Sequence, residues 1–82
     1  MFKVQATIKT ASGSNNVLIN SFKEEKNAQH CLNQIYSDKV KLATAHPDLF
    51  TIGKKTKNTL TYTQIPFQGV TRKITVRIIK TK

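Results

Sequence analysis

The sequence has few of the residues that build metal-binding, disulfide-stabilised or catalytic sites. It holds one cysteine (Cys31), two histidines and four acidic residues in a chain of 82, and it has no tryptophan. A single cysteine cannot form an internal disulfide or supply the thiol pair of a zinc knuckle. We therefore expect a reducing compartment in preference to secretion.

Long apolar runs are also missing. No stretch approaches the roughly 18 apolar residues that a membrane span needs. Residues 1–4 begin an alternating pattern, unlike the apolar run of a signal peptide. We expect a cytoplasmic protein without a membrane partner. Residues 1–82 are expected to form a single domain, with a narrow stability margin at this length.

Positive charge is abundant and unevenly placed. The formal net charge is +10, and residues 49–82 hold eight Lys or Arg residues and no Asp or Glu. A segment of one sign repels itself, and an anionic partner relieves that repulsion. A second interpretation stays open. Twelve of the fourteen cations are Lys, a bias that A/T-rich coding DNA produces without selection for binding.

The first half of the chain reads as strand, strand, helix. Residues 2–10 alternate between apolar and polar side chains, as in a half-buried strand. Residues 11–16 have turn chemistry, and residues 17–20 predict a short return strand. A helix is expected over residues 22–45, starting at a capping box of Ser21 and Glu24 and ending before Pro47. The pair Ser37 and Asp38 is a candidate kink.

In the second half of the chain, apolar and polar residues again alternate with a period of two. Residues 49–52, 59–65 and 71–80 predict strands, separated by a basic turn at 53–58 and a tight turn at Gln68 and Gly69. Pro66 would end the middle strand or lie at a sheet edge. Facing Leu60 and Tyr62 inward would expose Ile65 and Phe67, unless a bulge near Gln64 resets the alternation.

These elements predict an α+β fold, a two-layer sandwich in the order β-β-α-β-β-β. One main helix would cover one face of a mostly antiparallel sheet. The expected core residues are Ala28, Cys31 or Leu32, Ile35 and Val40 from the helix, and Phe2, Val4, Ile8, Ile74, Val76 and Ile78 from the sheet. The other face would carry Lys3, Gln5, Thr7, Lys9, Thr59, Thr61, Thr63, Lys73, Thr75 and Arg77.

That basic, hydroxyl-rich face favours non-catalytic binding of nucleic acid, mainly through phosphates. The candidate binding residues are Lys3, Lys9, Lys54, Lys55, Lys57, Arg72, Lys73 and Arg77. The face lacks the aromatics of a base-stacking platform, so weak sequence preference is expected. The competing interpretation is that the basic turn is a solvated hairpin tip and that the strand cations protect an edge against aggregation.

The sequence gives little support for a catalytic, metal-binding or nucleotide-binding site. His30 and Cys31 are adjacent on a helix and would not face each other, and Cys31 falls on the apolar stripe. His30 and His46 would lie roughly 24 Å apart on a straight helix, too far to share a metal. No glycine-rich phosphate loop occurs. We expect no enzymatic activity, no metal and no cofactor.

An interaction module is the alternative function. A small basic domain can act as an inhibitor or adaptor on an acidic protein. The strand at residues 71–80 is a candidate edge for a homodimer, helped by an apolar patch of Ile65, Phe67 and Ile79. The pattern leaves open DNA versus RNA, strandedness and oligomeric state.

Overall fold

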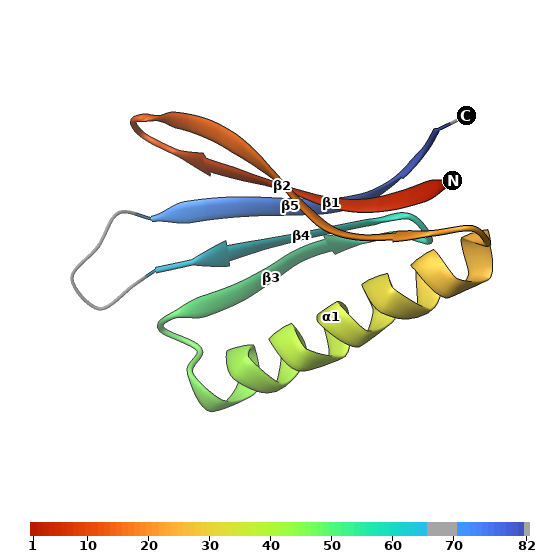
Figure 1. Cartoon of the computed structure of the whole chain (residues 1–82). Coiled ribbons are helices and arrows are strands. Elements are labelled where there is room, and N and C mark those ends of the chain that lie inside the picture. The colour runs from red at the N-terminus through yellow and green to blue at the C-terminus, as the bar shows by residue number, and fades with distance from the viewer. Residues whose placement is uncertain (66–70, 82) are drawn as a thin grey trace.

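The computed structural model describes residues 1–65 and 71–81 of the chain, and these form two layers (Figure 1). The elements are β1 (Phe2–Thr10), β2 (Gly13–Phe22), α1 (Glu25–Ala45), β3 (Phe50–Lys55), β4 (Thr59–Gln64) and β5 (Arg72–Lys80). The helix packs against one face of a five-stranded antiparallel sheet. The predicted α+β fold and its element order are confirmed.

The first and last strands pair with each other inside the sheet. The strand order is β2-β1-β5-β4-β3, so β5 is hydrogen-bonded on both sides. A homodimer through the strand at residues 71–80 was the wrong expectation, because no free edge remains there. The edges are β2 and β3. Sequence patterns indicated strands without showing which of them are neighbours.

The core lies between α1 and the central strands. Its buried members are Val4, Ala6, Ala28, Leu32, Leu60, Tyr62, Ile74 and Val76. Leu32 is fully buried, whereas Cys31 is half-buried at the margin of this cluster. The predicted inward orientation of Leu60 and Tyr62 is confirmed. Val40 is half-buried and lies outside the core cluster, contrary to expectation.

The hairpin of β1 and β2 is longer than its composition indicates. The turn spans Ala11 and Ser12, and the residues read as loop at 13–16 instead extend β2. Gly13 has φ of 140°, a conformation that other residues rarely adopt. The Thr7 hydroxyl donates to Asn16 Oδ1 at 2.8 Å across the pair. Pairing with β1 therefore overrides the low strand propensity of this polar segment.

The helix begins later than expected and without the capping box. Ser21 lies in β2 opposite Lys3, and the N-cap is Glu24, which makes no side-chain cap bond. The Glu24 carbonyl accepts from the backbone N–H groups of Asn27 and Ala28. The helix runs unbroken through Ser37 and Asp38 to Ala45. Because β2 extends through residue 22, Ser21 is part of a strand and does not cap the helix.

Two bulges interrupt the edge strands. In β2 the register shifts so that Ile19 is the extra residue between Leu18 and Asn20. In β3, Gly53 and Lys54 together oppose Thr61 of β4. In the described register Gln64 pairs regularly with Phe50 and Arg72, so no bulge resets the alternation there, and Ile65 is exposed as expected in that case. The predicted turn at Gln68 and Gly69, with Pro66 and Phe67, lies outside the described residues.

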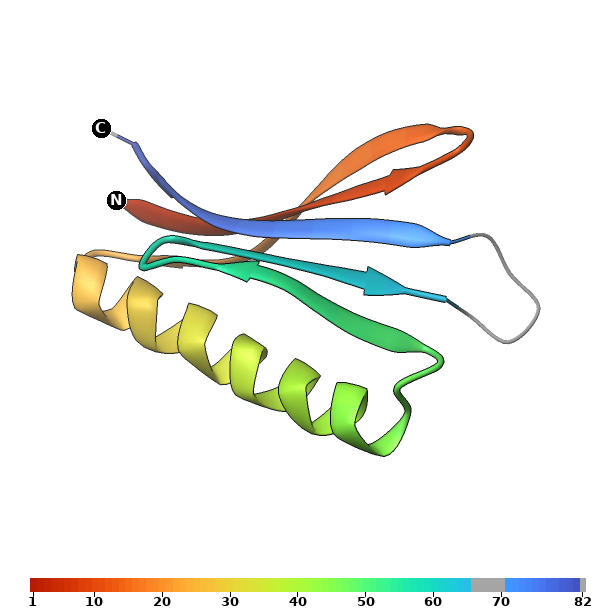
Figure 2. The ribbon, with the colours of Figure 1, turned by 180° about the vertical axis from the view of Figure 1, so that it is seen from behind.

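The helix covers the sheet unevenly. The helix contacts β3 more than any other strand, and Figure 2 shows the tip of the β1–β2 hairpin rising away from it. The opposite face of the sheet is covered by no element of the described chain, and we call it the open face (Figures 1 and 2). No helix in residues 1–65 and 71–81 is long and apolar enough to cross a membrane.

Leu32 anchors the helix to the sheet, so its truncation tests the packing. Leu32→Ala removes a fully buried side chain and is expected to lower the free energy of unfolding by about 2–5 kcal/mol. Leu42→Ala, on the same helix but outside the core cluster, is the matched control, with an expected loss below about 1 kcal/mol. Urea denaturation measures both. Equal losses would contradict the assigned helix face.

Candidate functional site on the open face of the sheet

The net charge is divided sharply between the two layers. Residues 23–49, which contain α1 and its flanking turns, hold four Lys and all four acidic residues, so they sum to zero. Residues 1–22 and 50–82, which contain the five strands, therefore carry the entire net charge of +10. Two of the acidic side chains interact within the helical layer: Glu24 pairs with Lys26 at 3.4 Å, and Glu25 accepts from Gln29. The sheet has no acidic residue to balance its cations.

The register assembles the open face as rows across the strands. Lys9 of β1 lies directly opposite Lys73 of β5, and Lys73 lies opposite Thr63 of β4. Like charges directly opposite each other on a sheet are destabilising. Since both ammonium groups are exposed, an anion placed over this pair would remove the repulsion.

The neighbouring row is made of hydroxyl groups. Thr7 lies opposite Thr75, and Thr75 lies opposite Thr61. The Thr7 hydroxyl bonds to Asn16, and the Thr61 hydroxyl accepts from the Lys54 N–H at 2.7 Å. These two groups are already engaged, which leaves Thr75 as the donor of this row best placed for a ligand.

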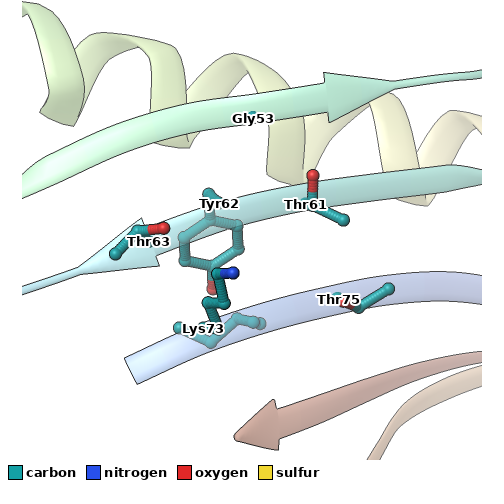
Figure 3. A pocket seen from close by; sticks show the side chains of 7 residues that line it. Gly53, Thr61, Tyr62, Thr63, Lys73 and Thr75 are labelled. Atoms are coloured by element: carbon teal, nitrogen blue, oxygen red, sulfur yellow. The ribbon is translucent and has the colours of Figure 1, made fainter. Parts of the chain in front are cut away.

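A shallow hollow of about 290 Å³ lies over β3, β4 and β5 on this face. Figure 3 shows Thr61, Thr63, Lys73 and Thr75 around it, with Gly53 at its rim and the helix behind the sheet. A Cβ at Gly53 would lie 2.6 Å from Thr61 Oγ1 and 3.2 Å from the Thr61 carbonyl oxygen, so a larger residue there would displace the Thr61 side chain or move β3 away from β4. Hydroxyl and ammonium groups around a small hollow are suited to an oxyanion.

Four of the eight predicted binding residues share the open face. Alternation along β1 and β5 places Lys3, Lys9, Lys73 and Arg77 there, all exposed. Arg77 pairs with Gln5 and Thr59, one row beyond the threonines. The predicted cationic face of the central strands therefore exists as one surface.

The basic turn contributes less than expected. Lys54 lies in the β3 bulge beside the open face, and Lys57 is exposed in the turn after β3. Lys55, however, pairs with the buried Leu60 and so lies on the helix side. Its ammonium group is 5.6 Å from the Tyr36 ring centroid. The bulge changes the alternation at this point, and a bulge is hard to read from a local pattern.

Arg72 also departs from the open face. It precedes Lys73 in the alternation of β5 and pairs with Gln64, on the side of the sheet that carries Ile74 and Val76. Arg72 and Lys55 are therefore separated by the sheet from the row of Lys9 and Lys73. Reasoning from the sequence missed the opposition of Lys9 and Lys73, because neighbours and register are not encoded in a local period. The lone Gly53 in a strand was the available signal for a close backbone approach.

The remaining candidate groups do not gather into a second site. Burial raises the pKa of the Cys31 thiol, which disfavours the thiolate that a nucleophile needs. His30 is exposed, while Cys31 packs against the core. Residues 1–65 and 71–81 contain no cluster of three His, Cys, Asp or Glu side chains arranged for a metal ion.

The repulsion between Lys9 and Lys73 can be tested by removing one of the two charges and measuring stability. Lys73→Gln is expected to raise the free energy of unfolding by about 0.2–1 kcal/mol at low salt, and the gain should disappear near 1 M salt because of screening. Thermal or urea denaturation measures it. Lys57→Gln removes the same charge from the exposed turn and should give a smaller gain. If both variants behave alike, general charge reduction explains the effect and the cross-strand pair does not.

Comparison with known proteins gives no assignment for this site. No family model, no curated protein and no solved structure matches the chain. The geometry and charge of the open face are therefore the basis for assigning a function.

Proposed function

We propose that this protein binds nucleic acid without catalysing a reaction, through the open face of β1, β5 and β4. The observation that carries the proposal is the surface formed by Lys3, Lys9, Lys73 and Arg77, with Lys9 opposite Lys73 and no acidic residue on the sheet. Phosphates are the anions that such a surface neutralises in nucleic acids.

The spacing of the cations favours a polymer over a small anion. Lys3 and Lys9 are six residues apart on β1, which corresponds to roughly 20 Å along a strand. Lys73 and Arg77 are four residues apart on the adjacent β5, or roughly 13 Å. A single phosphate contacts one end of this surface. A chain of several phosphates can follow its whole length.

The side chains on this face favour backbone contacts over base recognition. Lys and Thr supply point charges and hydroxyl donors to phosphate oxygens. Tyr62 faces the core, and the described part of the open face presents no aromatic ring for stacking. Little discrimination between base sequences is expected as a result.

An acidic protein is the second candidate partner, since the same cations would attract carboxylates. The segregation of charge between the two layers supports either partner. A strong salt dependence supports nucleic acid, because release of condensed counterions drives phosphate binding. A protein complex that also buries apolar surface should respond less to salt.

The first test measures affinity for labelled DNA and RNA, single- and double-stranded, by fluorescence anisotropy. With roughly five phosphates neutralised, the slope of log affinity against log salt should be about −4.5. Affinity should therefore fall several-hundred-fold between about 50 and 200 mM salt. Absence of binding at low salt would overturn the proposal.

Charge-reversal variants test whether the open face is the surface that binds nucleic acid. The double variant Lys73→Glu with Arg77→Glu should weaken binding more than tenfold and reduce the salt slope by about 2. The matched control, Lys23→Glu with Lys41→Glu, changes the net charge equally at exposed positions of the helical layer. Equal losses in the two double variants would mean that net charge alone attracts the nucleic acid, and that the open face is not the site.

A further inference from the structure

The exposed edge of β2 is unlike the rest of the protein surface. Residues 10–22 contain no charged side chain, although the chain as a whole has a net charge of +10. The opposite edge, β3, carries Lys54 and Lys55. Charged side chains on an edge strand oppose pairing with another chain. The β3 edge has this protection and the β2 edge does not.

Three consecutive apolar side chains are exposed on β2. Val17 is 46% exposed, Leu18 55% and Ile19 42%. Val17 pairs with Ala6 and so lies on the helix side, whereas Leu18 pairs with Gln5 on the open face. A partner stacked on one face of the sheet would cover either Val17 or Leu18. A strand lying beside β2 in the plane of the sheet would contact both of these side chains.

The same region is open on the helix side. A hollow of about 270 Å³ lies between α1 and the sheet, and its lining combines Ile19, Ile35 and Tyr62 with the charged Asp38 and Lys39 of the helix. The helix contacts β3 more than any other strand, and the tip of the β1–β2 hairpin rises away from it (Figure 2), so the part of β2 near the tip has less cover. A neighbouring molecule at the β2 edge would extend the apolar layer around this hollow.

We infer that β2 pairs antiparallel with β2 of a second copy of this chain, joining the two sheets into one. An antiparallel strand paired with itself forms a twofold interface in which each copy presents the same surface. On β2 the apolar residues are flanked by Asn15 and Asn16 on one side and by Asn20 and Ser21 on the other. This arrangement gives an apolar centre with a polar rim, as in protein interfaces.

The partner strand at this edge should itself be uncharged and apolar, and β2 of a second copy meets that requirement. Two molecules of charge +10 repel each other, and β2 is where they can meet without placing cation against cation. The neutral edge offers no charge that would attract an acidic partner. Screening weakens the remaining repulsion between the two bodies. Dimerisation should therefore strengthen with salt, whereas the proposed binding of nucleic acid weakens.

The bulge at Ile19 limits the affinity. Bulges on edge strands interrupt the ladder and restrict pairing. The bulge comes directly after Leu18, so regular pairing around a centre at Val17 and Leu18 is confined to a few residues, a short interface. We therefore place the dissociation constant near 100 µM, on the order of −5 kcal/mol of association free energy, at about 500 mM salt.

Sedimentation velocity of the full chain tests the inference over a concentration range reaching about 500 µM. A defined dimer is expected at about 500 mM salt, with at least about tenfold weaker association at 50 mM. A chain that stays monomeric at 500 mM salt overturns the inference and leaves the edge to a strand of a different protein. Larger polydisperse species would also overturn it.

A matched pair of variants assigns the dimer to β2. Leu18→Lys places a charge at the proposed contact and should weaken association at least about tenfold. Thr51→Lys adds the same charge to the exposed, opposite edge strand β3 and should leave association within about twofold of the original. Circular dichroism checks that both variants fold. Equal weakening by the two variants would contradict an interface at β2.

Hydrogen exchange gives an independent measurement on the unmodified chain. Outward-facing amides of β2 should become at least about tenfold more protected as the dimer forms, while the edge amides of β3 should not change. Protection that appears at β3, or nowhere, would overturn the inference. Both measurements are made without nucleic acid, so their outcome is separate from that of the binding experiments.

Discussion

The pairing of β1 with β5 is the interaction on which the rest of the structure depends. It joins the two ends of the chain: Phe2 pairs with Lys80, and the backbone of Met1 bonds to that of Thr81. Closing so long a loop has an entropic cost. Burial of Val4, Ala6, Ile74 and Val76 beneath α1 offsets it. The same pairing makes β2 and β3 the edges and sets Lys9 against Lys73.

Segregation of charge follows from how the two layers are built. The helical layer balances its cations with acids, and Lys39 lies over the Phe50 and Tyr62 rings at 5.9 and 5.2 Å. The sheet has no such compensation. Its apolar side packs against α1, so Lys3, Lys9, Lys73 and Arg77 face outward on the open face, whereas Lys55 and Arg72 lie on the helix side. A modest sequence bias toward Lys thereby becomes a concentrated positive potential on one side of the molecule.

The two edges of the sheet differ in a way that matters for association. β3 combines a bulge with two lysines, whereas β2 combines a bulge with neutral and apolar residues. If two molecules join at β2, their open faces become one longer cationic surface. A polyanion lying across it would screen the repulsion between the two copies. Binding and self-association would then strengthen each other, although each is driven by a different interaction.

The sequence by itself determined which side chains share a face. Alternation in residues 2–9 and 73–78 separates Val4 and Val76 from Lys3 and Arg77, and the helical spacing of Ala28 and Leu32 marks the packed side of α1. The tertiary structure decided the order of strands, the edge at β2, the recruitment of residues 13–16 into a strand, and the side on which Lys55 lies. Alternation and helical period are local properties of a few residues. Strand neighbours, register and bulges depend on contacts between segments far apart in the chain, which no local pattern specifies.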